Sequence, residues 1–407
     1  MTTYVIVGGG LAGAKTAEAL RERDGDARVV LISAEAHLPY ERPALSKGFL
    51  AGKESQEDFT VHESSWYQEN LIEVRSGTFA DAIDPATRTV TLSDGSAVAY
   101  DQLALATGSR PRGLGVPGVQ RPGVVTLRTI EEAAGLREVL GKGKRLVVIG
   151  GGWIGLEVAA SARELGAEVT ILEGSEHVLL KALGASIGDR FAELHRSHGV
   201  DVRTGISLDA IEGEGTSGAV TGVRLKDGET IPADAVLLAV GALPRVELAA
   251  AAGLDVDNGL VVDDTLRTSD SHIVAVGDIA HAEHPTLGHR VRVEHWANAQ
   301  AQADIAAATM VGDEAHYDAL PYFFTDQYDL GMEFRGERPD DERVIQRGSD
   351  SEHILFWLDA EDIVRAAMNV NVWDAGDDIE ALLASGQPID AERLADPTVS
   401  LSSLIDS

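Results

Sequence analysis

Cysteine is absent from the 407-residue chain. Its absence excludes structural disulfides, thiolate-bound zinc, cysteine-ligated iron–sulfur clusters and every cysteine nucleophile. Redox turnover through a thiol is therefore excluded as well.

Basic residues are scarce, with 34 Lys and Arg against 66 Asp and Glu, for a formal net charge of −32. Such a surface repels a phosphate backbone, which argues against nucleic acid as a partner. For the same reason, an acidic protein partner would have to dock on a local cluster of arginines.

Long apolar runs are also lacking. The stretches 146–156 and 235–243 contain glycine or are short, and both fall below the roughly 18–20 residues that span a bilayer. The opening MTTYVIVGGG has no basic segment and no apolar stretch of signal length. We therefore expect a cytoplasmic protein without a membrane partner. The 44% hydrophobic content allows two to four domains at about 100–200 residues each.

Two motifs recur in the same order. YVIVGGGLAGAKTA at 4–17 resembles LVVIGGGWIGLEVA at 146–159, and DQLALATGSRPR at 101–112 is echoed by DAVLLAVGALPR at 234–245. In the second motif, Gly108 corresponds to Gly241. The repetition predicts two copies of one nucleotide-binding unit.

β-rich runs alternate with helical patterns, which indicates parallel α/β sheets. Strands are expected at 29–32, 169–172, 235–240 and 273–276, and helices at 12–22, 131–140, 155–165, 186–198 and 294–311. Residues 88–92 before the Asp94–Gly95 turn suggest a small antiparallel insert. After residue 315 the pattern predicts antiparallel strands in 322–335, 343–347, 353–358 and 364–372 and a helix at 376–385. The predicted fold class is α/β, with two Rossmann-like domains and a C-terminal α+β domain.

The first glycine motif combines Gly8, Gly10 and Gly13 with Glu35, an acid about 20 residues further on at the end of the next strand. The glycines allow a tight turn, approach of a pyrophosphate to a helix N-terminus and helix–sheet packing, and the carboxylate accepts from ribose hydroxyls. The motif predicts dinucleotide binding; the alternative is a merely structural glycine turn.

The second copy has Gly150, Gly152 and Gly155, and Glu173 closes the following strand. A carboxylate at that position accepts from the free 2′-hydroxyl of NAD and repels the 2′-phosphate of NADP. No arginine follows in 174–178. The motif therefore favours NADH over NADPH.

With these two motifs, the sequence resembles the FAD-dependent pyridine nucleotide reductases of the glutathione reductase superfamily. More narrowly, it is similar to the ferredoxin reductases that serve cytochrome P450 and aromatic-ring dioxygenase systems. The resemblance covers almost the whole chain and rests on GGGLAG at 8–13, LPYERPALSKGFL at 38–50, ATGSRPR at 106–112, LRT at 127–129, GGGWIGLE at 150–157, VGDIA at 276–280, EHWANAQAQA at 294–303 and DQYDLGMEF at 326–334.

The resemblance implies two cofactor sites and three domains. The domains are an FAD-binding domain of residues 1–112 and 243–315, an NAD-binding domain of residues 113–242 and the C-terminal domain of residues 316–407. The implied FAD site comprises Gly8, Gly10, Leu11, Ala12, Gly13, Glu35, Arg42, Pro43, Lys47, Ala80, Thr107, Gly108, Arg128, Asp278, Glu294, His295 and Trp296. The implied NAD site comprises Gly150, Gly152, Trp153, Ile154, Gly155, Glu157, Glu173 and Gly241.

Some of these residues are assigned roles by the resemblance. Lys47 lies near the reactive end of the isoalloxazine and pairs with Glu157, which would otherwise be an exposed helix carboxylate. Asp278 bonds to hydroxyls of FAD, or only caps a helix.

A helix beginning in 294–297 directs its amides to the flavin O2. Aromatic residues complete the implied site. Trp296 forms a wall of the flavin site or packs in the core, and Trp153 gates the nicotinamide or packs between domains. Phe324 stands where these reductases commonly have tryptophan, so it covers the flavin without an indole N–H. Lys47, Glu157, Trp296 and Phe324 are thus the expected catalytic residues.

The function implied is hydride transfer from NADH to FAD and single-electron transfers to a [2Fe–2S] ferredoxin that feeds a cytochrome P450 or ring-hydroxylating oxygenase. Family ferredoxins are acidic, so a basic rim is expected among Arg110, Arg112, Arg290, Arg292, Arg335 and Arg338. Two alternatives stay open: a flavin NADH oxidase or quinone reductase, and a redox-sensing binding protein resembling apoptosis-inducing factor. The expected state is a monomer or weak homodimer.

No metal site is expected. The spacings of His281, His284, His289 and His295 match no metal-ligand motif. These histidines are expected to be solvated loop residues.

Overall fold

A computed structural model describes residues 1–215, 218–339 and 343–405 of the protein. Its first sheet has five parallel strands in the order β19-β7-β1-β2-β3. The bounds are β1 Thr3–Val7, β2 Arg28–Ile32, β3 Ile72–Arg75, β7 Gln102–Leu105 and β19 Ile273–Ala275. These strands are near-continuous apolar runs because a parallel sheet is covered on both faces. Helices α1 (Leu11–Arg23) and α8 (Trp296–Val311) pack together over it, although far apart in sequence.

The second parallel sheet repeats this plan in the order β12-β11-β10-β16-β9. Its strands are β9 Val124–Val125, β10 Arg145–Ile149, β11 Glu168–Leu172, β12 Asp201–Arg203 and β16 Ala235–Leu238. The strand before each glycine turn, β1 or β10, is flanked by the next strand of its unit and by the strand of the second motif, β7 or β16. The two-unit α/β fold predicted from the repeats is confirmed.

The helices of the second unit are α3 (Ile130–Val139), α4 (Trp153–Glu164), α5 (Leu180–Leu183) and α6 (Ala185–Ser197). The helix α3 begins at a capping box formed by Thr129 and Glu132. The helix expected from residue 294 begins later, at Trp296, because His295 is its extended N-cap.

The C-terminal sheet is antiparallel, in the order β22-β23-β26-β25-β24. The strand-rich run predicted over 322–335 is a hairpin of β22 (Tyr322–Gln327) and β23 (Leu330–Gly336), because the chain turns at Tyr328 with φ 57°. The other elements are β24 Arg343–Gly348, β25 His353–Leu358, β26 Val364–Val370, α9 Gly376–Ser385, α10 Ala391–Ala395 and η4 Ser402–Leu404. α9 has the bounds that the sequence predicted.

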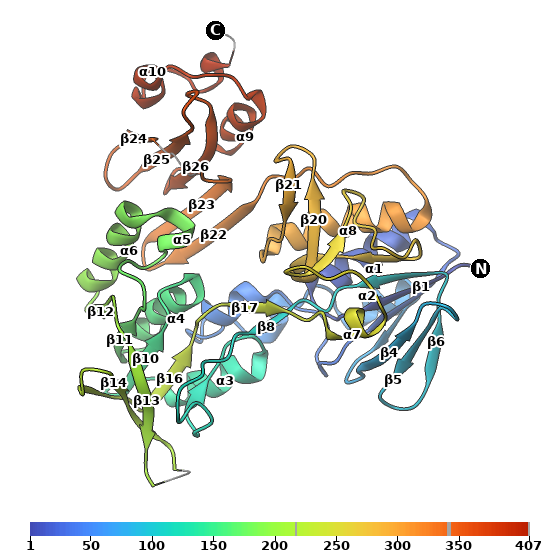
Figure 1. The fold of residues 1–407 in the computed structure, drawn as a ribbon, viewed down its shortest axis with the longest axis horizontal. Helices are drawn as coiled ribbons and strands as arrows, with labels where there is room; N and C mark the ends of the chain where they lie inside the picture. Colours follow the sequence, from blue (N-terminus) through green and yellow to red (C-terminus); the bar gives the residue numbers. More distant parts are fainter. Residues whose placement is uncertain (216–217, 340–342, 406–407) are drawn as a thin grey trace.

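Side-chain alternation divides the two faces of this sheet. Leu355 and Trp357 belong to the core shared with the second unit, whereas Ile354, Phe356 and Leu358 belong to the core under α9 and α10. Figure 1 accordingly shows the red C-terminal lobe above the green second unit.

Smaller elements connect the lobes. The two-stranded antiparallel sheet of β8 (Ser109–Pro111) and β17 (Ala242–Pro244) runs between the two units (Figure 1). The predicted insert around the Asp94–Gly95 turn belongs to the sheet β4-β5-β6, where Gly95 has φ 81°. The remaining elements are β4 Ala80–Asp84, β5 Thr89–Leu92, β6 Ala97–Ala99, β13 Leu208–Gly213, β14 Val220–Leu225, β15 Thr230–Pro232, β18 Leu260–Val262, β20 Ala280–His284, β21 His289–Val291, α2 Ser64–Glu69, α7 Glu247–Ala251, η1 Arg42–Ser46, η2 Gln56–Phe59 and η3 Gly277–Ile279. Within the described ranges, no helix combines the length and apolarity needed to cross a membrane.

Candidate active site

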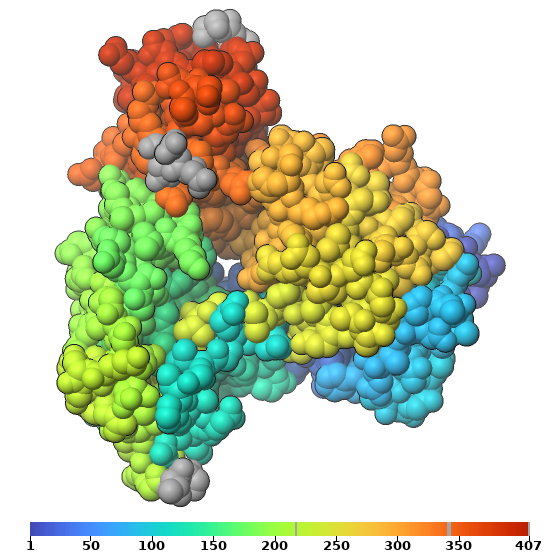
Figure 2. All heavy atoms as spheres, in the orientation of Figure 1, coloured from blue at the N-terminus to red at the C-terminus, as the bar shows by residue number. Residues whose placement is uncertain are grey.

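A cavity of about 1270 Å³ lies where the first parallel sheet, helix α4 and strand β22 meet. This volume exceeds the roughly 300–1,000 Å³ of most ligand pockets. The segments after β1, β7 and β19 line it, as expected for a site at the carboxyl ends of parallel strands. The space-filling view is hollowed between the green and the yellow-orange segments (Figure 2).

The first glycine turn has room for a ligand at one glycine only. A Cβ on Gly8, whose φ is +129°, would lie 2.1 Å from the Ala106 carbonyl oxygen, and one on Gly13 would lie 1.9 Å from the Gly8 carbonyl oxygen. A Cβ on Gly10 would meet only Arg42 Nη1, at 3.1 Å. Gly10 is the N-cap of α1 and has no side-chain cap, so the helix presents free amides beside a guanidinium. This cradle fits a pyrophosphate.

The second turn repeats the geometry. A Cβ on Gly150 would lie 2.3 Å from the Ala239 carbonyl oxygen, and one on Gly155 would lie 2.2 Å from the Gly150 carbonyl oxygen. A Cβ on Gly152, the uncapped N-cap of α4, would meet nothing within 4 Å. This second cradle therefore has the same room for a phosphate group.

Glu173 is held at the second turn by backbone amides. Its Oε2 accepts from the Gly151 N–H at 2.6 Å and its Oε1 from the Ser175 N–H at 2.7 Å. Gly150, Gly152, Gly155, Glu173 and Gly241 lie outside the lining of the large cavity, whereas Trp153, Ile154 and Glu157 are part of it. The predicted NAD residues thus form one group that meets the cavity through the start of α4.

Glu35 and Arg42 form an ion pair on the cavity wall. Arg42 Nη2 lies 2.6 Å from Glu35 Oε1, and the Tyr40 hydroxyl donates to Glu35 Oε2 at 2.5 Å. Arg42 Nε also donates to the Arg128 carbonyl oxygen at 3.1 Å. Burial, followed by the charge of Arg128, lowers the pKa of Arg42. The guanidinium is therefore fixed beside Gly10.

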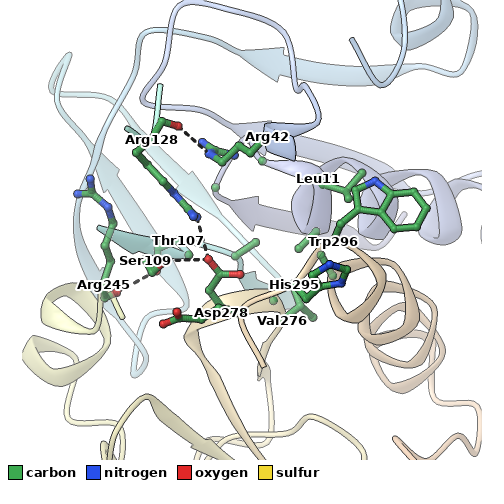
Figure 3. Close-up of a pocket in the computed structure, with 18 of the residues that line it drawn as sticks. Leu11, Arg42, Thr107, Ser109, Arg128, Arg245, Val276, Asp278, His295 and Trp296 are labelled. Atoms are coloured by element: carbon green, nitrogen blue, oxygen red, sulfur yellow. Dashed lines mark hydrogen bonds and ion pairs between the residues drawn. The ribbon is translucent and has the colours of Figure 1, made fainter. Parts of the chain in front are cut away.

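Asp278 is anchored deep in the same wall (Figure 3). Arg128 Nη2 donates to Asp278 Oδ2 at 2.9 Å and Ser109 Oγ donates to the same oxygen at 2.7 Å. Burial alone would raise the pKa of Asp278, but Arg128 and Ser109 outweigh it and hold the pKa below its ordinary value. Val276, not Asp278, is the N-cap of η3, so the helix-cap alternative is wrong.

The predicted pair of Lys47 and Glu157 is present, with Lys47 Nζ 2.7 Å from Glu157 Oε1. Glu157 also accepts from the Ser46 hydroxyl at 2.5 Å and from the Thr325 hydroxyl at 2.6 Å. Its side chain is only 7% exposed, so the alternative of an exposed helix carboxylate is wrong. The one carboxylate joins η1, α4 and β22.

An aromatic cluster begins at Lys47. Its Nζ lies 5.5 Å from the Phe324 ring centroid, which is within cation–π distance. Phe324 contacts His295 and Trp296 edge to face, at 5.3 and 6.2 Å between centroids. Trp296 lines the cavity and also packs on the first core, and its Nε1 is buried without a hydrogen-bond partner among the described residues. Trp296 is thus both a cavity wall and a core residue, and its place beside a flavin stays a prediction.

Trp153 packs between domains, as one of its two alternatives has it, and its role as a gate over the nicotinamide stays a prediction. It lines the cavity and packs against Phe191 and Phe323, at 5.7 and 4.6 Å between centroids. Phe323 comes from β22, so the ring sits between the second unit and the C-terminal sheet.

The four histidines differ from the expected solvated loop residues. His281 and His284 lie in β20, and His284 is fully buried. His289 lies in β21, where it is exposed and 2.8 Å from Glu337, and only it is solvated as expected. His295 caps α8 and lines the cavity. Burial and then Lys47 lower the pKa of His295 to about 4. In the described parts of the chain, no three His, Cys, Asp or Glu residues form a group that could hold a metal.

The six candidate docking arginines do not form one free group. Arg110 and Arg112 are exposed on or next to β8, and Arg290 and Arg292 line the cavity. Arg335 is 12% exposed and paired with Glu333 and Glu380, so it is a poor docking residue. Arg338 is half-buried and engaged within the chain.

The other predicted cofactor residues that line the cavity are Leu11, Ala12, Pro43, Ala80, Thr107, Gly108 and Glu294. The Thr107 hydroxyl donates to the Arg245 carbonyl oxygen at 2.9 Å (Figure 3). Sequence reasoning missed Ser46, Ser109 and Thr325. Ser46 and Ser109 are sequence neighbours of Lys47 and Gly108, and that proximity could have identified them. Thr325 lies 168 residues from Glu157, and no sequence pattern connects the two.

Comparisons with known proteins agree over nearly the whole chain. The family model described as pyridine nucleotide-disulphide oxidoreductase matches residues 2–303, and one described as reductase C-terminal matches residues 322–405. The chain is 41% identical to the ferredoxin–NAD(+) reductase component of an anthranilate 1,2-dioxygenase system from Burkholderia cepacia, over 99% of both chains. It is 38% identical to putidaredoxin reductase from Pseudomonas putida, over 98% of this chain and 96% of that one. A solved covalent complex of putidaredoxin reductase with putidaredoxin superimposes with a TM-score of 0.94 at 37% identity, covering 100% of this chain and 98% of the other.

Proposed function

The chain belongs to the pyridine nucleotide-disulphide oxidoreductase family, and from this premise we propose that it is an NADH-dependent ferredoxin reductase. FAD, when bound, would supply the chemistry that couples hydride donation by NADH to one-electron reduction of a [2Fe–2S] ferredoxin. The observation that carries the proposal is the Lys47–Glu157 pair on the wall of a large cavity in a chain without cysteine. With no thiol to relay them, the electrons leave directly to a partner.

The first cradle holds the FAD in this proposal. Gly10 and the first amides of α1, with Arg42, bind the pyrophosphate, and Glu35 accepts from a ribose hydroxyl. Asp278 binds a hydroxyl of the ribitol side through Oδ1, since both hydrogen bonds of its side chain to described residues end on Oδ2. The ammonium of Lys47 faces the isoalloxazine and favours negative charge there.

The second cradle holds NADH. Gly152 and the start of α4 bind its pyrophosphate, and Glu173 accepts from the ribose 2′-hydroxyl. The two amides that fix Glu173 keep a carboxylate where the 2′-phosphate of NADPH would sit. Trp153 and Phe323 exclude water from the contact between the two cofactors.

The predicted residue ranges of the three domains are part of the proposal, as are the cytoplasmic location and the monomer or weak homodimer. Strand pairing supports an FAD-binding domain made of two separate segments. β19 (Ile273–Ala275), from the second segment, joins the same sheet as β1 (Thr3–Val7), from the first. The partner is an acidic ferredoxin of a cytochrome P450 or dioxygenase system. Arg110 and Arg112 support its docking best, because both are exposed.

The test is reduction of cytochrome c by the yellow holoprotein and NADH, with and without a [2Fe–2S] ferredoxin, with NADPH as the control donor. A large stimulation by ferredoxin, with NADH only, is the expected result. Turnover indifferent to several ferredoxins, with oxygen or quinone consumed instead, would overturn the proposal in favour of the oxidase. Slow turnover with a long-lived charge-transfer complex and NADH-driven dimerisation would favour the redox-sensing alternative.

A further inference from the structure

A buried chain of polar side chains runs from Glu157, at the cavity, to Tyr328, at the far side of β22. Thr325 Oγ1 lies 2.6 Å from Glu157 Oε1, and Gln327 Nε2 lies 3.1 Å from Thr325 Oγ1. His195 Nε2 lies 2.9 Å from Gln327 Oε1, and the Tyr328 hydroxyl lies 3.0 Å from His195 Nδ1. This series of hydrogen bonds links the C-terminal hairpin of β22 and β23 to α4 and α6 of the second unit.

The three middle members are almost completely shielded from solvent. Thr325 and His195 are 0% exposed and Gln327 is 1% exposed. Buried polar groups are costly unless each one is hydrogen-bonded. Each buried nitrogen and oxygen atom of these three side chains has at least one hydrogen-bond partner.

The carboxylate at one end determines every proton position along the chain. An ionised carboxylate only accepts, so the Thr325 hydroxyl must donate to Glu157. Thr325 then has only lone pairs for Gln327, which must turn its NH₂ group toward Thr325 and its carbonyl oxygen toward His195. His195 must therefore carry its proton on Nε2, which leaves Nδ1 to accept from Tyr328.

The electrostatics of the far end agree with this assignment. Burial lowers the pKa of His195 to about 4, so the ring is neutral in the physiological range. Burial also raises the pKa of Tyr328, which keeps its hydroxyl proton. In each of the four hydrogen bonds the donor therefore lies on the Tyr328 side and the acceptor on the Glu157 side. Hydrogen bonds aligned in this way polarise one another.

The chain ends on the oxygen that holds the lysine. Oε1 of Glu157 accepts from Thr325 and also lies 2.7 Å from Lys47 Nζ, whereas Ser46 donates to Oε2. We propose that Thr325, Gln327 and His195 are positioning residues that hold the Glu157 carboxylate in one orientation, and thereby fix the ammonium of Lys47 at the cavity wall. This inference rests on the proposed function only for what Lys47 faces.

A first measurement, independent of turnover, is the tautomer of His195 from ¹⁵N NMR of the histidine-labelled holoprotein, with the signal assigned by His195→Gln. The Nε2–H tautomer is expected in the unsubstituted protein and in Tyr328→Phe, because the order is imposed from the Glu157 end. Thr325→Ser should keep it, and Thr325→Val should lose it because Gln327 is then free to turn over. An Nδ1–H tautomer or a charged ring at neutral pH in the unsubstituted protein would overturn the proposal.

The second measurement is stopped-flow reduction of the bound flavin by NADH. Thr325→Val should lower the limiting rate constant roughly three- to tenfold, the equivalent of one lost hydrogen bond, with the Kd for NADH unchanged. Thr325→Ser should restore the rate. Equal losses in the two variants, or no loss in Thr325→Val, would overturn the positioning role. Failure of the proposed function would be seen separately, as absent ferredoxin turnover alongside the expected His195 tautomer.

Discussion

Among single residues, the pairing of buried charges decides which of them are available for chemistry. Lys47 is 18% exposed and Glu157 is 7% exposed, so neither is solvated well enough to stand alone. Removing one member of a buried pair strands the other charge, which is more damaging than removing both. The pair therefore behaves as a unit in stability as well as in function.

We expect Lys47→Met to lower the free energy of unfolding by about 3 kcal/mol, because it leaves the Glu157 carboxylate buried without its cation. The double variant Lys47→Met/Glu157→Gln should recover much of that loss. Urea unfolding of the wild type, both single variants and the double variant measures the coupling. Strictly additive effects would contradict a coupled pair.

His195 gives the protein a defined sensitivity to acid. Its pKa is lowered from 6.5 to about 4 in the folded state. Between these values the unfolded chain binds a proton that the folded protein does not, so stability falls as the pH drops from about 6.5 toward 4. Between pH 7 and pH 5 this single group costs about 2 kcal/mol.

The His195→Gln variant should consequently lose about 2 kcal/mol less stability than the wild type between pH 7 and pH 5. Urea unfolding of both proteins at the two pH values tests this. His289→Gln is the control, because that exposed ring has a raised pKa and its removal should not reduce the acid loss. Equal acid losses in His195→Gln and the wild type would refute the assignment.

At the scale of elements, the two glycine turns are built by the same two contacts of backbone with backbone. In each turn the first glycine lies against the end of the strand of the second motif, β7 or β16, and the last glycine packs the helix onto the turn. The middle glycine has no backbone neighbour within 4 Å in either turn. Because the two turns belong to different sheets, each can be disabled by itself.

Adding a methyl group to the last glycine of each turn should separate the two sites. Gly13→Ala places its Cβ 1.9 Å from the Gly8 carbonyl oxygen and should weaken FAD retention at least tenfold; Gly155→Ala, with a 2.2 Å approach to Gly150, should weaken NADH binding at least tenfold in the holoprotein. Flavin content after gel filtration and NADH titration of the flavin spectrum measure the two effects.

The control for this pair is Gly135→Ala in α3, where an added Cβ meets nothing within 4 Å. This substitution should stabilise the protein by about 0.5–1 kcal/mol, since alanine is the better helix former. Loss of flavin from Gly155→Ala, or of NADH binding alone from Gly13→Ala, would reverse the assignment of the two turns.

At the scale of the whole molecule, the net charge of −32 repels an acidic partner, so docking depends on local positive charge. The Arg110 side chain is 44% exposed and its Nε lies 3.5 Å from Glu247 Oε1, in the β8–β17 sheet between the two units. Arg343, 51% exposed on β24, lies in the distant C-terminal lobe (Figure 1). The two arginines differ in position and little in exposure.

Arg110→Glu should raise the KM for an acidic ferredoxin several-fold and leave the KM for NADH unchanged, and the effect should fade with added salt. Arg343→Glu makes the same change in net charge and should alter neither constant. Steady-state kinetics with each substrate varied in turn measures both. Equal effects of the two variants would mean that overall charge, and not a rim near β8, governs docking.

The fold class and the two cradles could be predicted from the sequence because their signals are local. Gly8, Gly10 and Gly13 stand within one turn, and the strand that follows them is a continuous apolar run. The repeated motifs are local signals too, so the duplication could also be predicted. The start of α8 and the turn at Tyr328 were placed less well, since a cap and a single left-handed residue leave little trace in a periodic pattern.

The sequence by itself determined the chemistry that is possible: two dinucleotide cradles, an acid suited to NAD in the second, and no thiol. The tertiary structure alone decided which side chains meet. Thr325 reaches Glu157, and His284 is buried in a strand, through contacts between segments far apart in sequence. Local backbone preferences act over a few residues, whereas hydrogen-bond partners and burial are set only when separate elements pack.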